Sequence, residues 1–266
     1  MGAVERPLAV VTGASSGIGL ELAKVFVAEG FDLVVAAENA AVEDVARELA
    51  AGGARVDAVR ADLATFEGNE DLVAVVEEAG RPVAALAVNA GVGVGGDFVD
   101  DSDLRSHLRV VSLNIGSAVH LAKRLVPAMV DRGAGRVLFT SSVAGTAPGP
   151  FHSVYAASKA FLLSFSQALR EELRDSGVTV TALLPGPTDT DFFRRAGMTD
   201  TKVATGPKDD PAEVARAGFK ALMAGDDQVV AGSLRNKAQA VAGRVLPDPV
   251  TARVTRAMTE PGSAGT

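Results

Sequence analysis

The chain has 266 residues, a net charge of −7 and no cysteine. This length suits one large α/β domain or two small ones. The acidic charge argues against nucleic acid as a partner, and the lack of cysteine excludes disulfides, a thiolate nucleophile and a cysteine zinc site. We expect no metal site. Neither a signal peptide nor an apolar segment long enough to cross a bilayer is found, so we expect a cytoplasmic protein.

A strand, a glycine-rich loop and a helix are expected first. The apolar run Leu8–Val11 breaks at the loop 12–19, and a helical pattern follows and ends near Gly30. Glycines in such a loop let the backbone close on a pyrophosphate at a helix N-terminus. Glycine also marks ordinary turns, but its place directly after the first buried strand favours a dinucleotide site.

Strand and helix patterns then alternate. Continuous apolar strands separated by helices indicate a three-layer, doubly wound parallel sheet, that is, a Rossmann fold. We found no linker or repeat, so residues 1–266 are expected to form a single domain with a helical C-terminal tail. The expected strands are 32–36, 55–60, 83–88, 136–140, 178–184 and 228–231, and the expected helices are about 40–51, 67–79, 102–131, 154–175 and 210–224.

Residues capable of chemistry follow several of these strands. Asp62 follows the third strand, Asn89-Ala90-Gly91 the fourth, Ser141-Ser142 the fifth and Pro185–Thr188 the sixth. Each could be a turn residue. Because ligands bind at the carboxyl ends of strands in such sheets, their common position predicts a binding cleft there.

Tyr155 and Lys159 lie four residues apart in a helical pattern and therefore on one helix face. Tyr155 is the only tyrosine of the chain. The ordinary pKa of a phenol is about 10. An ammonium one turn away favours the phenolate, so we expect Lys159 to lower the pKa of Tyr155. A surface pair on an amphipathic helix is the alternative interpretation.

Taken together, these motifs resemble the short-chain dehydrogenase/reductase family in its single-domain form. The resemblance runs from about Leu8 to Leu184. It implies an NAD(P)-dependent enzyme of the carbonyl reductase or alcohol dehydrogenase type, which transfers hydride between a nicotinamide and a carbonyl or carbinol carbon. The motifs are Thr12-Gly13, Gly17-Ile18-Gly19, Asp62, Asn89-Ala90-Gly91-Val92, Asn114, Ser142, Tyr155, Lys159 and Pro185-Gly186.

The resemblance also implies four catalytic residues. Tyr155 would be the general acid in reduction and the base in oxidation, and Ser142, thirteen residues earlier, would hold the substrate oxygen. Lys159 would bond the nicotinamide ribose and lower the pKa of Tyr155, and Asn114 would hold a water that links Lys159 to solvent. Without the resemblance, Ser142 is interpreted as a turn residue and Asn114 as a helix residue bonding its own backbone.

The coenzyme choice depends on the end of the second strand. Many NADP-using members carry arginine where this chain has Glu38, and residue 16, often basic in them, is serine. A carboxylate repels a 2′-phosphate, so NAD(H) is favoured and NADP(H) is the alternative. Many NAD users have their acidic residue one position earlier, and Glu38 could simply be solvated. The expected coenzyme-binding residues are Gly13, Ser15, Ser16, Gly17, Ile18, Gly19, Glu38, Asp62, Leu63, Asn89, Ala90, Gly91, Tyr155, Lys159, Pro185, Gly186, Thr188 and Thr190.

The residues expected on the substrate side are largely apolar and predict a hydrophobic ketone or secondary alcohol. Residues 187–207 are predicted to form a lid that excludes water, although its two phenylalanines could instead pack in the core. The expected substrate-side residues are Val92, Val94, Val143, His152, Phe192 and Phe193.

The tail, residues 233–258, has apolar residues at helical spacing and carries +4 between Leu234 and Arg256. Such a helix either docks on its own or a neighbouring subunit or lies on an anionic membrane. The resemblance also implies a homo-oligomer, a tetramer or dimer, with contacts from helices 102–131 and 154–175. In the second of these helices, Phe161, Leu162 and Phe165 are candidate contact residues, or else pack internally.

Two other functions remain open at the level of sequence. One is a dinucleotide-binding sensor or scaffold without turnover, which does not need the whole set of catalytic residues. The other is a reductase of lipid-like ketones that associates with a membrane surface through its tail.

Overall fold

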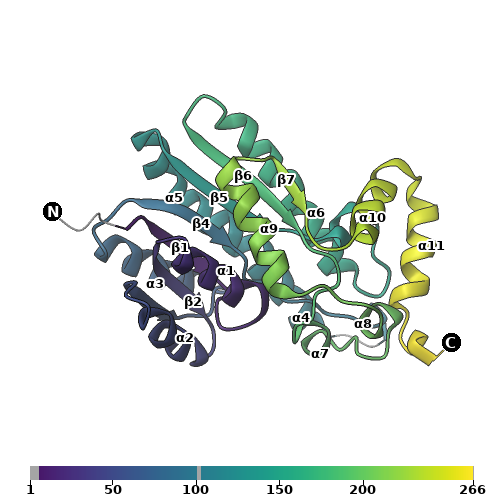
Figure 1. Ribbon diagram of the computed structural model, residues 1–266. Coiled ribbons are helices and arrows are strands. Elements are labelled where there is room, and N and C mark those ends of the chain that lie inside the picture. Colours follow the sequence, from purple (N-terminus) through teal and green to yellow (C-terminus); the bar gives the residue numbers. More distant parts are fainter. Residues whose placement is uncertain (1–5, 101–102, 266) are drawn as a thin grey trace.

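The computed structural model describes residues 6–100 and 103–265, and structural statements here concern these residues. A parallel sheet with strand order β3-β2-β1-β4-β5-β6-β7 forms its centre (Figure 1). The fold expected from the sequence is therefore confirmed. The strands are β1 (Leu8–Thr12), β2 (Asp32–Ala37), β3 (Val56–Arg60), β4 (Val83–Val88), β5 (Gly135–Thr140), β6 (Val178–Leu184) and β7 (Gln228–Val230).

Helices cover both faces of the sheet, which explains the continuous apolar strands. In β1, Leu8 and Val10 belong to one core and Ala9 and Val11 to the other, because successive side chains point to opposite faces. One face is covered by α1 (Gly17–Ala28), α2 (Ala41–Ala50) and α9 (Pro211–Ala224), and the other by α3 (Phe66–Glu78), α5 (Ala118–Arg132) and α6 (Ser153–Glu172).

The expected helix 102–131 is interrupted by a π-helical turn. Helix α4 (Leu104–Val111) continues through this turn, Ser112–Ser117, into α5. Such turns are rare in proteins, and those that do occur are often found at functional sites. This one holds Asn114, whose side chain points back toward the end of β4.

The tail forms two helices, α10 (Leu234–Val245) and α11 (Asp248–Thr259), which lie together at one end of the molecule (Figure 1). Pro247 is the N-cap of α11, and Pro249 lies in its first turn, where the missing N–H costs no helical bond. Within the described residues, no helix is long and apolar enough to span a membrane.

The segment predicted as a lid contains the short helices α7 (Phe192–Arg195) and α8 (Lys202–Thr205). Its two ends are joined at Asp209, whose backbone N–H donates to Pro187 and whose carbonyl accepts from Asp189. The carboxylate of Asp209 also accepts bonds from the N–H of Ser233 and the amide of Asn236. Asp209 therefore connects the lid to the start of α10.

At the amino ends of the strands, the carboxylate of Asp32 joins three segments. It accepts from the N–H of Arg55 at 2.8 Å and from Nη1 of Arg81 at 2.7 Å. Burial by itself raises the pKa of Asp32, but the bonds from Arg55 and Arg81 outweigh it and hold this pKa below its ordinary value. The carboxylate form therefore stabilises the fold.

We predict that Asp32→Ala lowers the free energy of unfolding by about 3 kcal/mol at neutral pH, because it leaves the half-buried Arg81 without this carboxylate. Since the folded pKa is depressed, this stabilisation is present above the unfolded pKa of about 3.9 and is lost as the pH falls through the folded value. Urea unfolding at a series of pH values measures it. Asp44→Ala, in the exposed pair with Arg47, is the control and should change stability by less than about 0.5 kcal/mol. Equal effects of the two variants would contradict the prediction.

Candidate active site

A cavity of about 980 Å³ lies at the carboxyl ends of the strands. Its walls come from the glycine loop, the segments after β2 to β6, the lid, and both tail helices. Every residue that the sequence predicted to bind coenzyme lines this cavity. Of the other predicted residues, only Asn114 and Val94 do not.

The glycine loop packs closely on itself and on the residues that follow β4. No side chain would fit at Gly13 or Gly19. A Cβ on Gly19 would lie 2.1 Å from the carbonyl oxygen of Gly13, and Gly13 itself has φ +69 with Ala90 beside it. Ser16 caps α1 without a side-chain bond to the first turn. The first N–H groups of a helix have no intrahelical partner and carry partial positive charge, so this cradle fits a pyrophosphate.

Asn89 fixes the neighbouring wall. Its amide donates to the carbonyl of Thr12 at 3.1 Å and its Oδ1 accepts from Thr140 at 3.1 Å, which ties together the ends of β1, β4 and β5. The Oγ1 of Thr12 in turn accepts from the N–H groups of Asn89 and Ala90. Three adjacent strand ends are thus held in one arrangement around the cavity.

Where the cavity is lined by the segments after β2 and β3, Arg109 of α4 forms ion pairs with two carboxylates. It donates to both oxygens of Asp62 at 2.9 and 3.0 Å and contacts Glu38 at 3.0 Å. The bond from Arg109 lowers the pKa of Asp62. Glu38 is therefore ion-paired rather than simply solvated. Arg109 was missed at the sequence level, because nothing in the local pattern links it to a residue 47 positions away.

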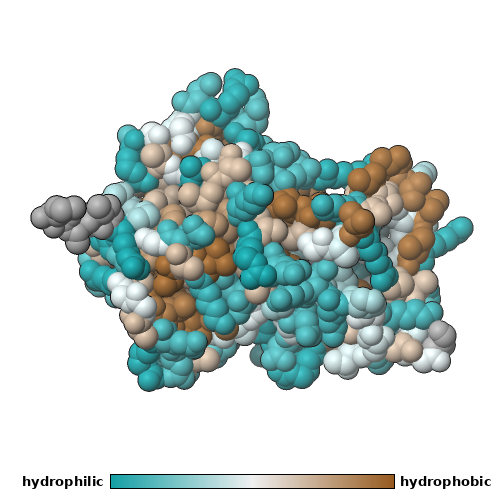
Figure 2. Space-filling view, viewed as in Figure 1, coloured by the Kyte–Doolittle hydropathy of each residue, from teal (hydrophilic) through white to brown (hydrophobic). Residues whose placement is uncertain are grey.

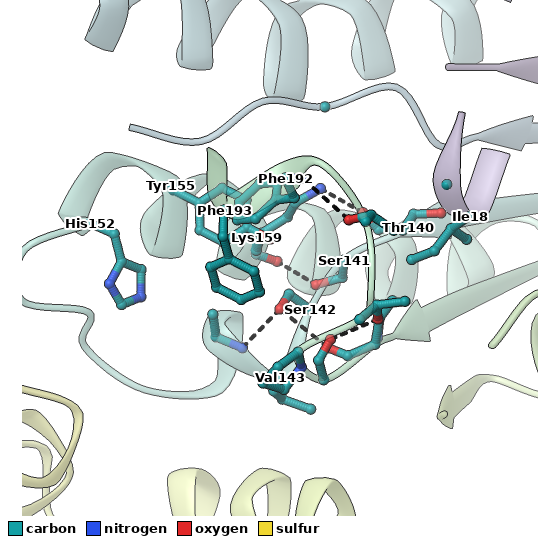
Figure 3. Close-up of a pocket in the computed structure, with 18 of the residues that line it drawn as sticks. Ile18, Thr140, Ser141, Ser142, Val143, His152, Tyr155, Lys159, Phe192 and Phe193 are labelled. Atoms are coloured by element: carbon teal, nitrogen blue, oxygen red, sulfur yellow. Dashed lines mark hydrogen bonds between the residues drawn. The ribbon is translucent and has the colours of Figure 1, made fainter. Parts of the chain in front are cut away.

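Ser142, Tyr155 and Lys159 meet at one wall of the cavity (Figure 3). The Oγ of Ser142 accepts from the N–H of Ala144 at 3.1 Å and donates to the carbonyl of Pro185 at 3.3 Å. Ser141 is turned the other way, and its Oγ donates to the carbonyl of Lys159 at 2.7 Å. The ammonium of Lys159 donates to the carbonyl of Thr140 at 2.8 Å and lies 5.7 Å from the ring centre of Tyr155.

Burial is the largest influence on the pKa values of Tyr155 and Lys159. It raises the pKa of Tyr155 to about 12, against a smaller lowering by the neighbouring hydroxyl of Ser142, and it lowers the pKa of Lys159 to about 8. The expectation that Lys159 holds the pKa of Tyr155 below its ordinary value is therefore wrong for this structure. Desolvation disfavours the charged form of each group, and the ammonium is directed at Thr140.

Asn114 lies behind the cavity wall and is almost fully buried. Its Oδ1 accepts from the N–H of Val92, and its Nδ2 donates to the carbonyl of Val92 and to Ser158. The side chain therefore does not bond its own helix backbone. It holds the segment after β4 against α6, next to Lys159.

The substrate end of the cavity is mainly apolar. Phe192 packs on the Tyr155 ring at 4.9 Å, and Phe193 is buried in a cluster with Ala196, Met198 and Ala204. His152 is buried 6.1 Å from the Tyr155 ring, and burial lowers its pKa to about 4. His152 is therefore neutral at physiological pH. Val94 was predicted here but does not line the cavity; its neighbours Gly93 and Gly95 are the residues that lie against Phe192 and Met198 of the lid.

The tail supplies a wall that the sequence did not predict. Residues of both tail helices line the cavity, and Thr259 at the end of α11 donates to the carbonyl of Pro150 in the loop before Tyr155. The apolar spacing predicted a helix here but gave no signal that its other face closes the cavity. The tail residues concerned are Arg235, Asn236, Ala238, Gln239, Ala242, Gly243, Leu246, Thr251, Val254, Thr255, Met258 and Thr259.

A doubly wound sheet with a glycine cradle and a Ser–Tyr–Lys wall defines the class of dinucleotide-binding enzymes. Within this class, residues 7–200 match the family model described as short chain dehydrogenase. The chain therefore belongs to the short-chain dehydrogenase/reductase family.

Individual relatives agree with this assignment. The chain is 32% identical over 223 residues to the oxidoreductase UcpA of Salmonella typhimurium, covering 84% of this chain and 82% of the relative. A short-chain dehydrogenase from Sphingobium yanoikuyae in complex with NADPH has a TM-score of 0.78 and 33% identity, covering 84% and 87% of the two chains. The bulky-bulky ketone specific alcohol dehydrogenase from Comamonas testosteroni has a TM-score of 0.76 and 28% identity, covering 91% and 93%.

The raised pKa of Tyr155 can be measured directly, because this is the only tyrosine and the chain has no tryptophan. We predict that phenolate absorbance in the near ultraviolet rises with a midpoint near the pKa of about 12 while circular dichroism shows an intact fold. Tyr155→Phe is the control and should show no such signal. A midpoint at or below the ordinary value of about 10 in the folded protein would contradict the prediction.

Proposed function

We propose that this protein is an NAD(P)-dependent oxidoreductase that transfers hydride between a nicotinamide and a hydrophobic ketone or secondary alcohol. The observation that supports this most strongly is the common position of Ser142, Tyr155 and Lys159. They share one cavity with the glycine cradle, so a dinucleotide in the cradle and a carbonyl at Tyr155 would occupy one continuous space.

The coenzyme would supply or accept the hydride, and the protein would position the substrate and move one proton. In reduction, Ser142 holds the carbonyl oxygen, and Tyr155 donates its hydroxyl proton to that oxygen as the carbon receives the hydride. With a pKa of about 12, Tyr155 is protonated at neutral pH and suited to this acid role. Lys159, whose ammonium lies 5.7 Å from the Tyr155 ring centre, would hold the nicotinamide ribose. Asn114 acts as a positioning residue through its bonds to Val92.

The carboxylate of Glu38 supports NAD(H) as the coenzyme, since it lines the cavity where the adenosine ribose would lie. NADP(H) is the second candidate for two reasons. Arg109 offers a cation at the same place, and the relative from Sphingobium yanoikuyae is in complex with NADPH. Repulsion of a 2′-phosphate by Glu38 and its attraction by Arg109 would together set the preference between NAD(H) and NADP(H).

The apolar lining supports a hydrophobic substrate, and the relative from Comamonas testosteroni is specific for bulky-bulky ketones. Residues 187–207 would act as a lid. Phe192 of this segment already contacts the Tyr155 ring, and both ends of the segment are fixed at Asp209, which supports its role as a cover over the substrate end of the cavity.

A homo-oligomer, a tetramer or dimer, is supported by an exposed apolar stripe on α4 and α5 that consists of Leu104, Leu108, Val111 and Val119. The candidate contacts on α6 are less suitable. Leu162 is buried in the core, and Phe161 and Phe165 stack on each other and pack against that core.

The acid role is tested with three variants. Tyr155→Phe should lower kcat by about 10³-fold or more while fluorescence titration shows that coenzyme still binds. Ser142→Ala should lower kcat/KM by about 100-fold, because it removes a bond to the substrate oxygen. Ser141→Ala is the matched control and should lower it by less than about tenfold, since its hydroxyl faces the carbonyl of Lys159.

The assay is loss of reduced-nicotinamide absorbance with a panel of ketones and both coenzymes. Retained turnover in Tyr155→Phe would remove the assignment of the acid. Coenzyme binding without turnover of any ketone or alcohol by the wild-type protein would instead identify a catalytically silent sensor or scaffold.

The coenzyme choice is tested with Glu38→Ala. Removal of this carboxylate leaves Arg109 available to a 2′-phosphate, so the ratio of kcat/KM with NADPH to that with NADH should rise about tenfold or more. Glu43→Ala, exposed on α2, is the control and should leave the ratio unchanged. A wild-type protein that already prefers NADPH strongly would overturn the choice of NAD(H).

A further inference from the structure

The outer face of α10 carries an apolar stripe that no described part of the chain covers. Leu234 is 81% exposed, Val241 62% and Val245 75%, and Ala238 lies between them at the same helical spacing. The helix packs on the body through its opposite face, where Gly243 lies against Thr146. Leu234, Val241 and Val245 therefore do not pack on their own subunit, and a neighbouring subunit or an anionic membrane remains as the surface that they could contact.

The stripe continues onto α11, where Val250 and Val254 are exposed. Figure 2 shows apolar residues gathered over both helices at the end of the molecule that they form, with hydrophilic residues beside them. We call this surface, made by the exposed side chains of residues 234–259, the hairpin face.

The hairpin face is continuous with the catalytic cavity. A shallow depression of about 520 Å³ on α10 is lined by Ala238, Ala242 and Leu246, and the same three residues line the cavity. Val254 is 62% exposed and also lines the cavity. An apolar molecule resting on the hairpin face would therefore reach the cavity past small and apolar side chains.

The charge of the hairpin differs from that of the rest of the chain. Because the whole chain carries −7 and residues 234–259 carry +4, the remainder carries −11. On the helical wheel of α10, Lys237 and Arg244 lie along one edge of the apolar stripe and Arg235 along the other. Basic residues at the edges of an apolar stripe are typical of helices that lie in the plane of an anionic lipid surface.

A second copy of the chain fits this face less well. Symmetric dimers use the same surface patch on both subunits, which would place +4 against +4. An anionic bilayer accepts both the apolar stripe and the charge around it.

We propose that the hairpin face binds anionic lipid bilayers and that apolar carbonyl substrates pass from the bilayer to Tyr155 between α10 and α11. The part of this proposal that concerns substrate rests on the proposed function, whereas lipid binding does not. It narrows the substrate class to amphiphilic ketones or alcohols that partition into membranes.

Lipid binding is tested by co-sedimentation of the full chain with vesicles of phosphatidylcholine alone and of phosphatidylcholine with about one-third phosphatidylglycerol. We expect the wild type to bind the anionic vesicles and to lose binding at high salt. Val241→Ser/Val245→Ser should weaken binding about tenfold, and Lys237→Glu/Arg244→Glu should remove the preference for anionic vesicles. Arg216→Glu/Lys220→Glu, exposed on α9 with the same change in net charge, is the matched control and should bind as the wild type does.

Substrate passage is tested with the same variants. Val241→Ser/Val245→Ser should lower kcat/KM about tenfold for a long-chain ketone held in vesicles and leave a short water-soluble ketone unaffected, because neither residue lines the cavity.

Three outcomes would overturn the proposal: no binding of the wild type to anionic vesicles, an equal loss of binding in the α9 control, or a lower oligomeric mass of Val241→Ser/Val245→Ser in sedimentation, which would make the hairpin face a subunit contact. If the wild type binds vesicles but converts no ketone, the proposed function fails and the lipid contact stands.

Discussion

Helix α6 passes residue 145 so closely that only glycine fits there. A Cβ on Gly145 would lie 2.6 Å from the carbonyl carbon of Lys159. This close packing brings the ammonium of Lys159 to the carbonyl of Thr140 and the hydroxyl of Ser141 to the carbonyl of Lys159. Ser142 is extended, so its side chain points to the other side of the chain from Ser141 and faces the cavity. The chemistry proposed for this wall depends on that contact.

Much of the fold follows from local pattern. Apolar runs bounded by glycine and separated by helical spacing were sufficient to predict the parallel sheet, and a parallel sheet places all strand ends at one edge. The spacing of Tyr155 and Lys159 put both on one helix face, as the structure has them. These features depend on residues near each other in sequence, for which periodicity is informative.

Other features depend on distances that sequence patterns do not contain. The partnership of Arg109 with Asp62 and Glu38 joins three elements across the end of the cavity. The pKa of Tyr155 depends on how much water the surrounding elements exclude, and here burial exceeds any effect of the ammonium. The apolar spacing of α10 identified a stripe, but not the direction that it faces. An amphipathic pattern gives the same signal whether its apolar side lies inward or outward.

The bonds of Asp209 have a consequence for how this chain can diversify. The groups proposed to carry out the chemistry end at Lys159, whereas the lid, residues 187–207, and the tail from Leu234 line the cavity from later in the chain. Asp209 fastens both enclosing parts to each other and to Pro187, and α11 returns to Pro150 through Thr259. The proposed reactive groups thus precede both the lid and the tail in the chain. An exchange of the C-terminal stretch as one unit would replace the lid and the tail together and leave the proposed reactive groups in place, provided that Asp209 is retained.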